Sequence, residues 1–177
     1  EVRERLVVDA SRAFGVSYIY TNLLGNEAGR VIYDGDAMVA SNGVLLTSGP
    51  RLSYEDFVLV SAVVDVEATR LRQVQDRGPI ARDASEWVIK INFDFPAIEP
   101  RTQKAELEAW ERGGYLKEEE FSRAVALGLF DYLRKSRSQG YVLSLSGGAD
   151  SSAIAALVFL MIRMAVENIG LYGVKKK

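Results

Sequence analysis

The sequence contains no cysteine and no histidine among its 177 residues. Without cysteine the chain supplies no disulfide, no thiolate zinc ligand and no cysteine nucleophile. Without histidine it supplies no imidazole general base. These two absences exclude most hydrolase mechanisms for this chain.

Long apolar runs and dense positive charge are also missing. The longest unbroken apolar run, residues 153–162, ends at Arg163 and is too short to span a bilayer, and the first residues lack the apolar core of a signal peptide. The net charge is −2, and the basic clusters at 134–137 and 175–177 are short. We therefore expect a cytoplasmic protein with no nucleic-acid partner and no membrane partner.

The first half of the chain predicts a helix followed by strands. Apolar residues share one helical face over residues 1–14, and Gly15 can end that helix in the left-handed conformation. Asn42-Gly43 between two apolar runs predicts a tight hairpin. Runs rich in Val, Ile, Leu and Tyr predict the strands of an antiparallel meander, at 17–24, 31–40, 44–48 and 57–66.

The second half changes period. Residues 67–75 are helical in pattern, and Gly78-Pro79 and residues 92–100 are typical of a connector. From Lys117 to Lys135 the spacing predicts an amphipathic helix whose apolar face is formed by Phe121, Ala124, Val125, Gly128, Leu129 and Tyr132. A strand at 141–145 and a helix over 151–169 follow. This order predicts the start of a doubly wound parallel sheet.

The segment between that strand and that helix reads Ser-Leu-Ser-Gly-Gly-Ala-Asp-Ser-Ser, residues 144–152. Adjacent glycines let the backbone aim several N–H groups into one concavity, and a helix that starts directly afterwards adds the positive end of its dipole. No Lys-Ser or Lys-Thr follows the glycines, so this is not a Walker loop. The alternative is a structural turn in which Asp150 and Ser151 cap the helix.

The segment resembles the Ser-Gly-Gly-x-Asp-Ser pyrophosphate loop of the N-type ATP pyrophosphatases. The resemblance implies a loop that holds the pyrophosphate released from ATP, through backbone N–H groups of the Gly-Gly-Ala run and through serine hydroxyls. Asp150 would be a magnesium ligand, because a carboxylate among phosphates needs a cation between them. The predicted ATP-binding residues are Ser144, Leu145, Ser146, Gly147, Gly148, Ala149, Asp150, Ser151 and Ser152.

The first half resembles the closing strands of the nitrilase-type amidase fold. The resemblance is carried by Ile32-Tyr33-Asp34-Gly35-Asp36, by the Asn-Gly hairpin, and by Val63-Val64-Asp65-Val66. We interpret Asp34 and Asp36 as turn and strand-edge residues rather than catalytic ones, because Asp-Gly is common turn chemistry.

The order of these segments is similar to that of glutamine-dependent NAD synthetases. The resemblance implies an α/β chain: the C-terminal part of a nitrilase-like α-β-β-α sandwich at residues 1–92, a linker at 93–116, and the start of an ATP pyrophosphatase domain at 117–177. It implies a ligase that uses ATP and Mg²⁺ and takes deamido-NAD and glutamine as its other substrates. We expect no catalytic residue in this chain, the rest of the same polypeptide as its partner, and a homo-oligomer.

Two alternatives remain open at this stage. One keeps the loop but changes the acceptor, as in GMP or asparagine synthetases, whose glutaminase parts have other folds. The other is a non-catalytic scaffold module in which the Ser-Gly-Gly turn is only structural.

Overall fold

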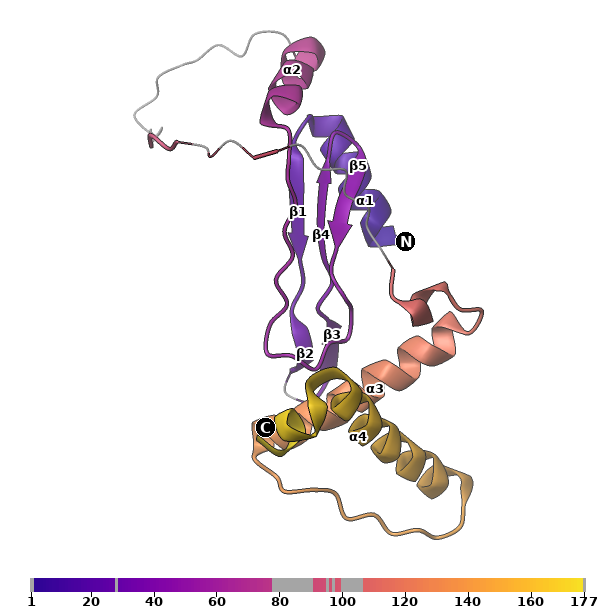
Figure 1. Cartoon of the computed structure of the whole chain (residues 1–177). Coiled ribbons are helices and arrows are strands. Elements are labelled where there is room, and N and C mark those ends of the chain that lie inside the picture. Colours follow the sequence, from indigo (N-terminus) through magenta and orange to yellow (C-terminus); the bar gives the residue numbers. More distant parts are fainter. Residues whose placement is uncertain are drawn as a thin grey trace. The chain divides into compact units, whose positions relative to one another are not determined.

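The computed structural model describes residues 2–27, 29–77, 91–94, 96, 98–99 and 107–176 (Figure 1). The helices are α1 (Val2–Phe14), α2 (Val66–Arg77), the 3-10 helix η1 (Ala109–Arg112), α3 (Leu116–Ser136) and α4 (Ala149–Lys176). The strands are β1 (Ser17–Thr21), β2 (Leu24–Glu27), β3 (Val31–Asp34), β4 (Ala37–Ser41) and β5 (Val44–Ser48). The described residues fall into two compact units.

The first unit contains α1, α2 and a three-stranded sheet in the order β1-β4-β5. Its core joins the helix to the sheet through Val7, Met38 and Ala40. Gly15, at φ +58°, ends α1, and Val16 donates its N–H to the carbonyl of Ser11 over 3.1 Å. Asn42 and Gly43 both have positive φ, at 51° and 82°, which is the conformation of the predicted two-residue hairpin turn.

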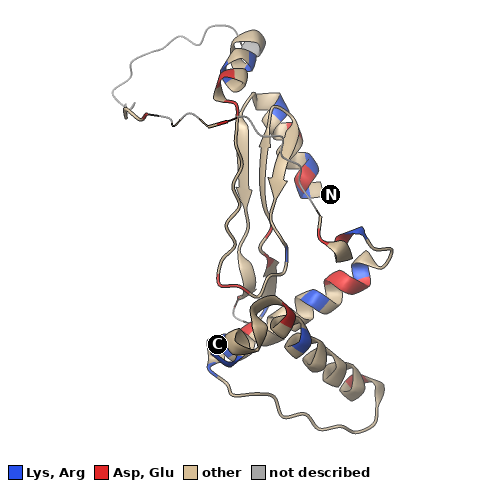
Figure 2. Ribbon diagram, in the orientation of Figure 1, with Lys and Arg blue, Asp and Glu red and all other residues tan. Residues whose placement is uncertain are grey.

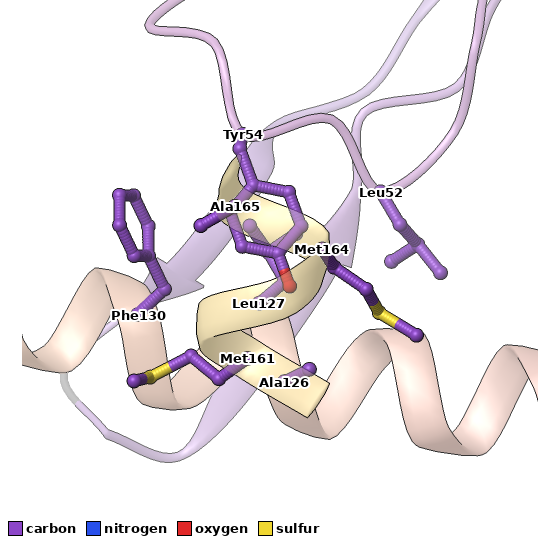
Figure 3. Close-up of a cluster of buried hydrophobic side chains, with 8 residues drawn as sticks. All are labelled: Leu52, Tyr54, Ala126, Leu127, Phe130, Met161, Met164 and Ala165. Atoms are coloured by element: carbon purple, nitrogen blue, oxygen red, sulfur yellow. The ribbon is translucent and has the colours of Figure 1, made fainter. Parts of the chain in front are cut away.

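The second unit contains the antiparallel pair β2-β3, the segment after β5, and the helices η1, α3 and α4. Its core is formed by side chains from α3, α4 and the segment after β5, and Figure 3 shows them facing one another. Tyr54 and Phe130 meet edge to face with ring centroids 5.1 Å apart. The core residues are Leu52, Tyr54, Ala126, Leu127, Phe130, Met161, Met164 and Ala165.

Helix α3 lies directly against the β2-β3 pair. A Cβ added at Gly128 would sit 2.6 Å from Cδ1 of Ile32, so any larger residue there would force the Ile32 side chain to move. Asp131 is buried, and its carboxylate accepts the N–H of Asn26 over 2.8 Å. Arg134 pairs with the same carboxylate at 2.8 Å. This part of the first half is therefore fixed to a helix of the second half.

The predicted helices form, and the α/β class is confirmed. Helix α4 begins at Ala149, two residues before its predicted start, and its regular backbone is interrupted at Gly170, with φ 70° and ψ 164°. The predicted apolar face of α3 is partly wrong: Phe121 and Tyr132 are exposed, whereas Leu127 and Phe130 are buried. Apolar residues occur on more than one side of this helix, and packing selects among them.

Two predicted strands do not appear. Residues 57–65 and 141–145 lie outside any helix or strand, and Val142 is fully exposed. A strand is stabilised by pairing with a neighbour, and within the described part of the chain residues 141–145 have no strand beside them. The described residues therefore do not confirm the parallel sheet or the nitrilase-like arrangement, although the sheet β1-β4-β5 does form. Of the connector expected at 78–79 and 92–100, residues 78, 79, 95, 97 and 100 lie outside the described residues.

Helix α4 is long and apolar enough to cross a membrane by length and composition alone. Figure 2 shows few charged residues along it, whereas they are dense in the first turns of α3. Three features oppose a span: Met161 and Ala165 pack in the protein core, Arg163 and Glu167 form an ion pair on the helix, and Gly170 breaks its backbone. A helix that is apolar on all sides is equally typical of the interior of a larger soluble protein.

Candidate functional site

The segment 144–152 joins residues 141–143 to the start of α4 and is open to solvent. Residues 144–150 and Ser152 are exposed, and Ser151 is half-buried. Gly147 has a φ of +80°, and a Cβ added there would meet no atom within 4 Å. The bend therefore uses a conformation that favours glycine and faces free space rather than packed apolar side chains.

The first turn of α4 supplies the donors that a phosphate group would need. Ser152 donates its N–H to the carbonyl of Gly148 over 3.2 Å, which is the first hydrogen bond of the helix. The N–H groups of Ala149, Asp150 and Ser151 precede it, so the helix itself offers them no acceptor. Together with the positive end of the helix dipole, they form a cluster of donors suited to an anion.

The serine hydroxyls are held within the loop. Ser151 and Ser152 donate through Oγ to the carbonyl of Gly148, at 3.1 and 2.9 Å, and the Oγ atoms of Ser146 and Ser151 are 3.3 Å apart. A hydroxyl has one proton to donate. In this conformation the hydroxyls of Ser151 and Ser152 shape the loop, and each would have to rotate before it could donate to a ligand.

Asp150 lies in the first turn of α4 and is exposed. Among the described residues no group of three or more acidic side chains could hold a metal ion. A lone carboxylate does suit Mg²⁺ that is bound together with phosphate, because Mg²⁺ keeps several waters and takes only one or two carboxylates besides substrate oxygens. The donor set at the loop therefore fits magnesium in the company of a polyphosphate.

Packing along α4 sets the position of the loop. Met161, Met164 and Ala165 pack against α3 and against Leu52 and Tyr54 of the segment after β5. Burial raises the pKa of the Tyr54 phenol, and the nearby Asp131 raises it further, while Arg123 opposes the change. The helix that carries the loop is thus anchored by its middle, and its first turn is left free for a ligand.

Three aspartates of the first half form hydrogen bonds in a turn or at a helix start. Asp34 accepts hydrogen bonds at Oδ1 from the Asn22 amide, at 2.8 Å, and from the N–H of Asp36, at 3.3 Å, so Asp34 and Asp36 lie at the end of β3 and in the turn that leads to β4. Asp65 begins α2 by accepting the N–H of Ala68 over 2.8 Å.

The sequence did not indicate a cluster centred on Arg51. Its guanidinium donates to Glu111 at 2.7 Å and to Glu120 at 2.6 Å, and it lies 5.0 Å from the centre of the Trp110 ring. Burial by itself lowers the pKa of Arg51, but the hydrogen bonds to the two carboxylates raise it above its ordinary value. These partners lie 60 and 69 residues along the chain, and no local pattern predicts such pairs.

The chain is similar to curated proteins that share one name, although it matches no family model. No family model matches the chain. The chain is 35% identical over 170 residues to a glutamine-dependent NAD(+) synthetase of Macaca fascicularis and 32% identical over 174 residues to that of Homo sapiens. Each match covers 94% of this chain and 24% of the relative. The chain thus spans about a quarter of the length of these relatives.

A solved structure gives the same result. The crystal structure of a glutamine-dependent NAD(+) synthetase from Cytophaga hutchinsonii aligns with 99% of this chain and 22% of its own, at a TM-score of 0.68 and 39% sequence identity. These values confirm the resemblance seen in the order of the sequence motifs. Over nearly its whole length, the chain is similar to a segment that makes up about a quarter of a glutamine-dependent NAD(+) synthetase.

Proposed function

We propose that the protein containing this chain is a glutamine-hydrolysing NAD synthetase, a ligase that amidates deamido-NAD. ATP adenylates the nicotinate carboxylate, and ammonia released from glutamine displaces AMP to leave the amide. The observation that carries this proposal is the similarity to proteins of that name over nearly the whole chain, combined with an exposed Ser-Gly-Gly-Ala-Asp-Ser loop at a helix start.

In this proposal the loop at 144–152 binds the pyrophosphate part of ATP. The N–H groups of the first turn of α4 and the backbone at Gly147 and Gly148 surround the leaving oxygens, and Ser146, Ser151 and Ser152 add hydroxyl donors. Negative charge grows on the leaving pyrophosphate as the bond to the α-phosphorus breaks, so backbone N–H groups already aimed at it lower the barrier, and the hydroxyls of Ser151 and Ser152 add to this after they rotate away from Gly148. Asp150 would hold Mg²⁺, which supplies neutralising charge when it is bound with ATP.

The proposal also assigns a domain to each part of the chain. Residues 1–92 belong to the glutaminase domain, 93–116 form the linker, and 117–177 begin the synthetase domain. The glutaminase nucleophile is expected in the rest of the same polypeptide, since this chain contains no cysteine. We further propose a cytoplasmic homo-oligomer that acts on small molecules only. No observation favours another acceptor or a scaffold role.

The test uses the full-length protein and two ammonia sources. With ATP, Mg²⁺ and deamido-NAD, both glutamine and ammonium salts should support NAD formation. When deamido-NAD is replaced by the acceptor substrate of GMP synthetase or of asparagine synthetase, no AMP should be formed from ATP. Asp150→Ala should abolish synthesis from either source and leave glutamine hydrolysis largely intact. Arg163→Gln, at an exposed ion pair on the same helix, is the matched control. Full synthesis by Asp150→Ala would remove that carboxylate from the mechanism.

A further inference from the structure

Arg51 joins three separate segments of the second unit. Its guanidinium meets the carboxylates of Glu111 at 2.7 Å, Glu120 at 2.6 Å and Asp34 at 3.8 Å. Asp34 ends β3, Glu111 lies in η1, and Glu120 lies in the second turn of α3. The side chains of Arg51, Glu111 and Asp34 are 16%, 9% and 14% exposed, so solvent screens their attraction only weakly. A planar guanidinium holds its N–H donors in fixed directions, whereas the ammonium of a lysine is a compact charge on a flexible stem.

Trp110 adds cation–π contacts to the same cluster. The guanidinium carbon of Arg51 lies 5.0 Å from the centre of the indole ring, and that of Arg123 lies 5.1 Å from it. Both distances are within the range in which a cation is attracted to an aromatic face. The ring therefore ties the segment after β5 to η1 and to α3 at once.

The backbone beside Arg51 is held in an unusual conformation. Leu52 has a φ of +57°, which a leucine adopts only when its surroundings require it, and its N–H donates to the carbonyl of Asp34 over 2.7 Å. Its side chain is buried in the core shared with α3 and α4. The turn at 51–52 is thus fixed by charge, by packing and by the main chain.

The contacts continue from this turn to the candidate loop. Arg51 holds Glu120 at the start of α3, α3 packs along α4, and α4 begins at the exposed loop. The turn itself follows β5 after Gly49 and Pro50, within residues 1–92, which the proposed function assigns to the glutaminase domain. We infer that Arg51 is a positioning residue that keeps ammonia release in the glutaminase part coupled to ammonia use in the synthetase part. This inference rests on the proposed function.

Arg51 would affect coupling because ammonia can escape when the glutaminase and synthetase parts are not held in position. Ammonia that reaches solvent is lost to synthesis, so coupling needs the two parts to keep a fixed geometry. A displacement of about 1 Å far from the reacting atoms can alter a rate by roughly a hundredfold. Weakening the Arg51 cluster should therefore raise the amount of glutamine hydrolysed per NAD formed, and should affect glutamine hydrolysis alone and ammonium-driven synthesis alone much less.

The experiment measures three rates in the full-length enzyme: glutamine hydrolysis, NAD formation driven by ammonium, and NAD formation driven by glutamine. Arg51→Lys keeps the positive charge and removes the planar set of N–H donors. Glu120→Gln removes one of the partner charges and is the milder variant if the first fails to fold. Arg163→Lys is the matched control at an exposed ion pair. We expect the glutamine consumed per NAD to rise about threefold or more in both test variants, while ammonium-driven turnover stays within about twofold.

The outcomes separate the two proposals. An unchanged ratio of glutamine to NAD in Arg51→Lys and Glu120→Gln would overturn the positioning role. An equal loss of ammonium-driven and glutamine-driven synthesis would also overturn it, because that pattern shows only a damaged fold. Failure of the wild-type enzyme to form NAD from ammonium and deamido-NAD would instead overturn the proposed function.

Discussion

Replacing Gly147 by alanine tests whether the loop conformation itself binds ATP. Gly147 has a φ of +80°, and an added Cβ would meet nothing within 4 Å. The substitution therefore causes no clash, and its effect comes from backbone strain, which for a residue other than glycine is roughly 1–2 kcal/mol in this region. If the loop relaxes to avoid that strain, ATP must restore the strained conformation on binding.

The expected loss follows from that energy. A cost of roughly 1–2 kcal/mol corresponds to a fall of about 5-fold to 30-fold in kcat/KM for ATP. The assay is ammonium-driven NAD synthesis by the full-length protein with ATP varied. Glutamine hydrolysis by the same preparation should be unchanged, which shows that the variant is folded.

Gly170 provides the matched control. It also has a positive φ, at +70°, and a Cβ added there would likewise meet nothing within 4 Å, but it lies at the break in α4 rather than in the loop. Gly170→Ala should also strain the backbone locally, at φ 70° and ψ 164°, and leave kcat/KM for ATP near the wild-type value. A role of the Gly147 conformation in ATP binding is refuted if Gly147→Ala stays within about twofold of wild type, or if both variants lose the same amount of kcat/KM.

Further predictions concern the core that positions α4, and hydrogen exchange in the peptides of α3 measures each of them. Tyr54 is buried, and its hydroxyl has no hydrogen-bond partner among the described residues. Because a buried hydroxyl without a partner is costly, Tyr54→Phe should raise the free energy of local opening by about 1 kcal/mol. A clear decrease would show that the hydroxyl does have a hydrogen-bond partner in the folded protein. Burial raises the pKa of Tyr54 above its ordinary value of 10.0, so the unfolded state loses the phenol proton at a lower pH than the folded state does. The protection of wild-type amides from hydrogen exchange should therefore fall as the pH rises above that value, and Tyr54→Phe should not show this fall. Gly25→Ala would place a Cβ 1.9 Å from Oδ2 of Asp131 at a φ of +89°, and should lower the free energy of opening by roughly 3 kcal/mol through strain and the loss of the hydrogen bond to Asn26; unchanged protection would contradict this packing.

Features set by neighbouring residues could be predicted from the sequence. The Asn42-Gly43 turn and the end of α1 at Gly15 depend on backbone conformations that few residue types adopt, and both form as expected. The Ser-Gly-Gly loop was found for the same reason, since its glycines and the helix after it are adjacent in the chain. Its role in binding ATP stays a prediction.

Features set by distant residues could not be predicted. The partners of Arg51 lie 60 and 69 residues away, and Asp131 meets Asn26 across 105 residues. A single sequence contains no signal for such pairs, because each charged residue alone is typical of a solvated surface. The face of α3 that becomes buried was likewise decided by the approach of Ile32 to Gly128 and by α4.

We propose above all that the loop at 144–152 binds the pyrophosphate of ATP with Mg²⁺ at Asp150. The most direct measurement is a calorimetric titration of the full-length protein with ATP, with and without Mg²⁺, for wild type and Asp150→Asn. We predict tight binding by wild type only when Mg²⁺ is present, and loss of that magnesium dependence in Asp150→Asn. Equal binding with and without Mg²⁺ in wild type, or an unaltered magnesium effect in Asp150→Asn, would contradict the claim.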